Sequence, residues 1–136
     1  MNSNLQGICK NLFDEFRGQL TWEWDDWIGT ILAKFSTAES AAVRAALDRF
    51  LPVVWNSSTM NSAPPIVQTL DRKLGEIRPG QLLFSSDSNQ GAFIFCAWWP
   101  WADGNTISIR VAPHDAQLTA EDASRLMAEL KKFAGI

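Results

Sequence analysis

The sequence predicts an α+β domain, with N-terminal helices, a three-stranded antiparallel β-meander and a C-terminal helix packed on the sheet. Three observations support this. Apolar residues recur at helical spacing up to about residue 75, alternate with period two between residues 81 and 112, and return to helical spacing after residue 119. The chain has 136 residues and no repeat or linker composition, so we expect a single domain over residues 1–136.

Two of the N-terminal helices have recognisable boundaries. The first has an apolar face that includes Leu5 and Leu12, and Gly18 is a suitable C-terminal stop. Another follows Ser36, which could cap it, and ends at Pro52, because the residue before a proline is pushed out of helical geometry.

A further helix is predicted between these two, beginning near Thr21. Its apolar positions would form one stripe: Leu20, Trp24, Trp27, Ile28, Ile31 and Phe35. The acidic residues Glu23, Asp25 and Asp26 would then lie in its first turns, where they complement the positive end of the helix dipole. On this interpretation Trp24 and Trp27 belong to the core.

Residues 56–65 are polar and contain two prolines, so they predict a mobile loop, and a short helix should run from Pro65 to Gly75. Strands are predicted at residues 81–86, 92–99 and 106–112, separated by turn-forming residues. The middle strand is apolar on both alternating sets, so it should be central and covered on both faces. A last helix should run from Thr119 to Phe133, with Gly135 as its stop.

Composition disfavours several classes of function. The net charge is −3 and the twelve Lys and Arg residues are scattered, whereas nucleic-acid binding needs a concentrated basic surface. No apolar run approaches the roughly 20 residues that span a bilayer, so no membrane association is expected. The first thirty residues lack a secretory pattern, which favours a cytoplasmic location.

The sequence offers little catalytic or metal-binding chemistry. It contains no phosphate-binding glycine loop and no nucleophile elbow. Cys9, Cys96 and His114 are the only soft ligands, one fewer than a structural zinc site needs, and whether the two cysteines form a disulfide is left open. The single histidine is expected to be an exposed loop residue. We therefore predict no catalytic residue, no metal and no cofactor.

Two tryptophan-containing segments are the candidate binding sites. In the first, Trp22 lies among Glu23, Asp25 and Asp26, and the stretch 14–26 holds five carboxylates against one arginine. An exposed Trp22 in an acidic patch would attract a basic protein, because aromatic anchors supply binding energy and charge steers approach. Alternatively, Trp22 packs back against the first helix.

The second segment contains Trp98, Trp99 and Trp101. Trp98 and Trp99 should point to opposite faces of the sheet, and Trp101 falls at the following turn. At least one of these rings should be exposed or line a groove. The cluster is either core packing or a binding surface or aromatic pocket.

These features favour a non-enzymatic, acidic, protein-binding module. The specific hypothesis is a small inhibitor of the immunity-protein type, which neutralises a cognate bacterial toxin by direct binding. The alternatives are a secretion-effector chaperone, a small-ligand-binding protein that uses a Trp-lined pocket, and an enzyme built on Glu23, Asp26 or His114.

Overall fold

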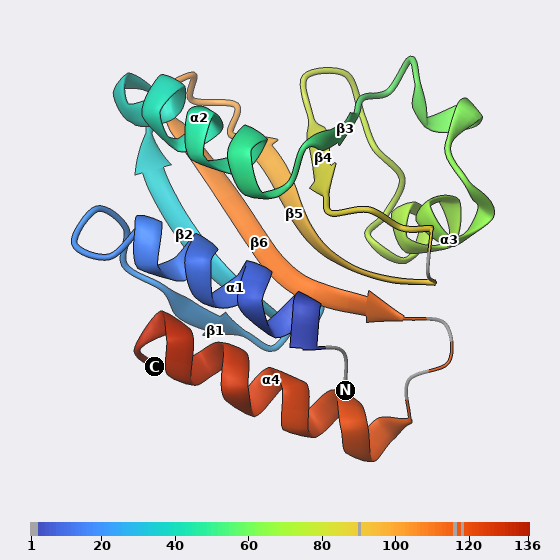
Figure 1. Cartoon of the computed structure of the whole chain (residues 1–136). Coiled ribbons are helices and arrows are strands. Elements are labelled where there is room, and N and C mark those ends of the chain that lie inside the picture. The colour runs from blue at the N-terminus through green and yellow to red at the C-terminus, as the bar shows by residue number, and fades with distance from the viewer. Residues whose placement is uncertain (1–2, 90, 116, 118) are drawn as a thin grey trace.

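A computed structural model describes residues 3–89, 91–115, 117 and 119–136. Four α-helices surround a six-stranded, wholly antiparallel sheet of order β1-β2-β6-β5-β4-β3 (Figure 1). The helices are α1 (Ser3–Glu15), α2 (Ser40–Phe50), α3 (Pro65–Lys73) and α4 (Ala120–Ala134). The strands are β1 (Glu23–Asp25), β2 (Thr30–Ser36), β3 (Val53–Trp55), β4 (Leu82–Ser85), β5 (Ala92–Pro100) and β6 (Thr106–Asp115).

The α+β class and the meander are confirmed, because β4, β5 and β6 pair in sequence order. The last helix also has the predicted ends. The Thr119 hydroxyl accepts the Asp122 N–H at 3.1 Å, and Gly135 adopts the left-handed conformation, φ 81°, that favours glycine. The prediction of only three strands is wrong, because β1, β2 and β3 extend the sheet on both sides.

The helix predicted from Thr21 is instead the hairpin β1–β2. Trp24 and Ile31 lie seven residues apart, and residues with this spacing lie on the same face of a helix. Here the two residues are instead directly opposite each other across the hairpin. Gly29 has φ 67° in the turn, a left-handed conformation that favours a hairpin over a continuous helix. From Thr30 onward the apolar residues Ile31, Ala33 and Phe35 alternate, as a half-buried strand requires.

Strand β3 was not predicted. It comprises three residues directly after Pro52 and pairs with β4 at the edge of the sheet. Three residues are too few to show an alternating pattern, so this strand depends on its partner rather than on a local signal.

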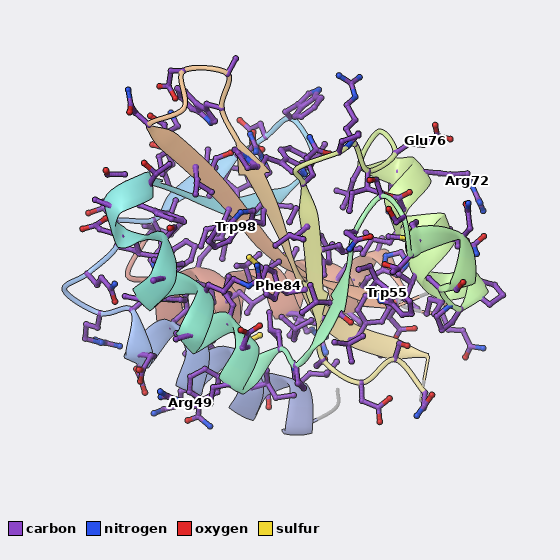
Figure 2. The ribbon with its side chains drawn as sticks, turned by 90° about the horizontal axis from the view of Figure 1, so that it is seen from above. Arg49, Trp55, Arg72, Glu76, Phe84 and Trp98 are labelled. Atoms are coloured by element: carbon purple, nitrogen blue, oxygen red, sulfur yellow. The ribbon has the colours of Figure 1, made fainter. Side chains whose placement is uncertain are left out.

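Both faces of the central strand β5 are covered, as predicted. Ile94, Cys96 and Trp98 enter a core formed with α1, α2 and α4, whereas Phe93 and Phe95 enter a second core formed with α3. In Figure 2, with α2 on one side of the sheet and α3 on the other, Phe84 and Trp98 lie centrally and Trp55 lies toward α3.

The segment between β3 and α3 contains a short 3₁₀ turn at Met60–Ser62. Met60 and Ala63 are buried in the second core, and the Asn56 side chain accepts the Ser58 and Thr59 N–H groups. The mobility of this loop stays a prediction. No helix in the described part of the chain is long and apolar enough to cross a membrane.

Candidate functional site

Exposed aromatic rings from two turns of the sheet gather around one hollow of the surface. On the face that bears the second core, α3 packs over β4 and β5 through Val67 and Leu70. Around this hollow lie Trp27 from the β1–β2 turn, Trp99 from the end of β5, Trp101 from the turn after β5, and Arg110 from β6. We call these four residues the tryptophan face.

Trp27 is the most exposed aromatic residue of this surface, with 72% of its area accessible. It lies in the β1–β2 turn, and its ring meets that of Trp99 edge-on with centroids 6.4 Å apart. The Arg110 guanidinium lies 4.5 Å from the Trp99 centroid and 5.9 Å from the Trp27 centroid. One cation therefore contacts both rings, an arrangement that holds them together.

Arg110 is fixed by an ion pair with Asp25. Its Nε donates to Asp25 Oδ2 at 2.9 Å, and the two side chains are only 15% and 14% exposed. The other Asp25 oxygen accepts the Trp27 N–H at 3.1 Å. Burial raises the pKa of Asp25, but the Arg110 and Trp27 hydrogen bonds outweigh burial and lower it below the ordinary value. Asp25 thus joins the turn that carries Trp27 to the arginine beneath it.

Trp101 completes the surface at the β5–β6 turn. It is 44% exposed, and Lys34 Nζ lies 5.6 Å from its ring centroid. A hollow of about 480 Å³ lies among the three rings and the segment after α3, where Glu76, Arg78 and Gln81 line it. This volume is in the range of small-molecule sites.

The tryptophans divide differently from the sequence-based expectation. Trp22 is buried, 6% exposed, and meets Phe13 of α1 edge-on at 4.9 Å, so the hypothesis of an exposed Trp22 anchor is wrong and the alternative of packing on the first helix is correct. Trp27, expected in the core, is exposed. Trp98 is buried, and Trp99 and Trp101 line the hollow, which confirms that part of this cluster borders a groove.

Sequence reasoning missed Trp27 and Arg110 as site residues. A turn signal was present, because Asp25-Asp26 precedes Trp27 and Gly29 follows it, but the helical spacing of the apolar residues concealed it. Arg110 lies in a strand that the sequence predicted, but its contact with Asp25, 85 positions away, has no local signature.

The acidic stretch 14–26 is largely neutralised. Asp14 pairs with Lys10 and Arg17, and the next three carboxylates pair with cations from other elements. Those pairs are Glu15 with Arg49, Glu23 with Lys34, and Asp25 with Arg110. Asp26 accepts a hydrogen bond from Trp24 Nε1. The expected concentrated acidic patch is therefore dispersed.

His114 lies in β6 rather than in an exposed loop. It is half-buried beside Phe93, with ring centroids 5.4 Å apart, and its Nε2 is buried without a hydrogen-bond partner in the structure described.

Cys9 and Cys96 are free, buried thiols, and burial raises the pKa of Cys9 to about 12. Within the described ranges, no group of three or more His, Cys, Asp or Glu side chains is placed to hold a metal ion.

Comparisons with protein-family models, curated proteins and solved structures give no match to this chain. The class that the fold and the site define is an α+β domain with an ordered aromatic surface around one hollow. Its function is therefore inferred from this surface.

Proposed function

We propose that this protein is a non-enzymatic protein-binding module that docks its partner on the tryptophan face. The observation that carries the proposal is the exposure of Trp27, which contacts Arg110 and lines the same hollow as Trp101. Tryptophan and arginine are the residue types most enriched at the energetic centres of protein interfaces. A partner that covers the exposed ring removes its apolar area from water, and this burial contributes favourable binding free energy.

The rigidity of the surface supports the same conclusion. Arg110 is held by Asp25 and lies against Trp99, so its side chain is already ordered before binding. Binding costs less conformational entropy when the anchor residues are ordered in advance. A surface built in this way suits a partner of fixed shape.

In its specific form, the proposal is that the partner is a bacterial toxin and that the protein is an inhibitor of the immunity-protein type. The small size and the net charge of −3 support this form, because an acidic inhibitor favours association with a basic partner. The net charge of the whole molecule, rather than a local acidic patch, would steer the partner, because the carboxylates of residues 14–25 already have cationic partners.

Partner capture from source cells at low salt tests the proposal. The wild-type chain should retain one stoichiometric partner that inhibits growth when produced alone, and adding the chain should remove that toxicity. The double variant Trp27→Ser/Trp101→Ser should lose the partner while keeping its circular dichroism spectrum. Ile136→Ser removes another exposed apolar residue away from this surface and is the matched control.

The outcomes separate the hypotheses. Capture that is unaffected by the double variant contradicts the proposed docking surface. A captured protein without toxicity, bound by a stable dimer of this chain, would instead indicate a secretion-effector chaperone.

A second candidate function is small-ligand binding in the hollow of the tryptophan face. The specific observation is its lining, in which three indole rings face polar side chains of Glu76, Arg78 and Gln81. Such a mixture suits a ligand with one apolar face and several hydroxyl groups, such as a sugar. Oligosaccharide titration should then quench the tryptophan fluorescence of the wild type. The fluorescence of the double variant should not change during the same titration.

A further inference from the structure

A second cavity lies between α3 and α4, at the end of β6. Its volume is about 470 Å³, within the range of small-molecule sites. In Figure 1, α4 runs along the lower edge of the view and α3 lies at the right, with the end of β6 between them. The cavity shares Trp27 and Leu74 with the lining of the hollow beside the tryptophan face, but its other lining residues are different.

Most of the lining is apolar. Phe95 and Ala112 come from the sheet, Leu70 and Leu74 from the α3 region, and Met127 from α4. Phe95, Ala112 and Leu70 also belong to the second core, so this part of the lining is continuous with the protein interior. An apolar ligand body would therefore gain hydrophobic stabilisation from these walls.

Two of the polar side chains that line the cavity carry nitrogen atoms that can donate hydrogen bonds to an anion. Lys73 and His114 both line it, from α3 and β6 respectively. Lys73 has no carboxylate within ion-pair distance in the described part of the chain. Burial and the positive charge of Lys73 lower the pKa of His114, against a smaller opposite effect of Asp115. The α4 and hairpin residues that line the cavity carry no charge.

An unpaired ammonium beside apolar walls is complementary to an amphipathic anion. We propose that this cavity binds a small aliphatic carboxylic acid, with its chain against Phe95, Leu70 and Met127 and its carboxylate at Lys73. The neutral His114 imidazole can add a hydrogen bond to the carboxylate. This inference does not depend on the proposed docking function, because it rests on residues outside the tryptophan face.

Isothermal titration calorimetry with decanoate and decanol at pH 7.5 tests the proposal. The two probes have the same chain length but differ in charge. Decanoate should bind more tightly than decanol by about tenfold, because only its carboxylate can pair with Lys73.

Variants then locate the binding site. Lys73→Gln should remove the preference for decanoate, and Lys132→Gln, a change to a lysine of α4 that does not line the cavity, should keep it. Ala123→Phe places a ring in the cavity and should abolish binding of both probes. Since Lys73 is exposed, Lys73→Gln should stay folded even if Ala123→Phe does not.

Equal affinity for decanoate and decanol, a Lys73→Gln variant that keeps the preference, or no heat of binding from either probe would overturn the proposal. The Trp27→Ser/Trp101→Ser capture experiment has a separate readout, so failure of this inference and failure of the proposed function are distinguishable.

Discussion

The seven tryptophans of this chain occupy very different environments. Trp22 and Trp98 are core residues, whereas Trp27 and Trp101 face solvent. Trp22 and Trp27 are only five positions apart, so exposure here depends on the hairpin and not on residue type. A substitution at either site therefore tests a different property of the protein.

Trp22→Ala should lower the free energy of unfolding by about 3–5 kcal/mol, because it leaves a cavity between α1 and the sheet. Trp27→Ala should cost less than about 1 kcal/mol, since most of its ring is already in water. Urea denaturation followed by circular dichroism measures both. Similar losses in the two variants would contradict the assignment of Trp27 to the surface.

His114 should make stability depend on pH near neutrality. Its pKa is lowered in the folded protein, chiefly by burial, so between that value and the ordinary value near 6.5 the unfolded chain binds more protons. Stability should therefore fall as the pH drops below about 6.5. His114→Gln should flatten this part of the profile in urea titrations between pH 7.5 and 5, and an unchanged slope would contradict the environment described for the imidazole.

At the scale of elements, the β1–β2 hairpin joins the sheet through the pairing of β2 with β6, and an ion pair adds a direct link from β1 to β6. Three-residue β1 is an edge strand with few hydrogen bonds of its own. The Asp25–Arg110 pair joins it to β6 across β2, and the Asp25 bond to the Trp27 N–H orders the turn. The hairpin and the tryptophan face should therefore loosen together.

Asp25→Asn should lower the free energy of unfolding at pH 7 by about 1.5–3 kcal/mol, the usual contribution of a hydrogen bond to a charged group. The lowered pKa of Asp25 stabilises the protein above the ordinary value near 4, and this contribution is lost as the pH falls through the lower folded value. The variant and the wild type should thus converge once the pH falls below the lowered pKa of Asp25 in the folded protein. Hydrogen exchange should show faster exchange at the hairpin amides, and protected amides in the variant would contradict the role of the pair.

At the scale of the whole molecule, the sheet separates two cores. Cys9 of α1 and Cys96 of β5 both lie in the larger core and are fully covered. Burial raises the pKa values of both thiols, which suppresses the reactive thiolate. Their reactivity should consequently report the opening of the whole core.

In the native state, a thiol reagent should label both cysteines only as fast as the protein unfolds globally. Labelling should accelerate in Trp22→Ala, which destabilises this core, and stay near the wild-type rate in Trp27→Ala. Mass spectrometry after timed labelling measures both rates. Rapid modification of folded wild-type protein would contradict the packing of this core.

The sequence alone determined the elements whose signals are local. The capped helix α4, the helices α1, α2 and α3, and the meander β4-β5-β6 follow from periodicity, caps and turn residues. The prediction that a ring of the Trp98–Trp101 segment borders a groove also follows from alternation, since neighbouring strand residues point to opposite faces.

Only the tertiary structure decided the hairpin β1–β2, the edge strand β3 and the makeup of the site. Trp24 and Ile31 fit one helix face as well as they fit a cross-strand pair, so packing on β6 resolved the choice. Arg110 reaches Asp25 only after the sheet has formed, and this pair both neutralises one carboxylate of the acidic stretch and orders the turn that carries Trp27. The physical reason is that long-range pairing brings together residues whose chemistry is set by partners far away in the chain.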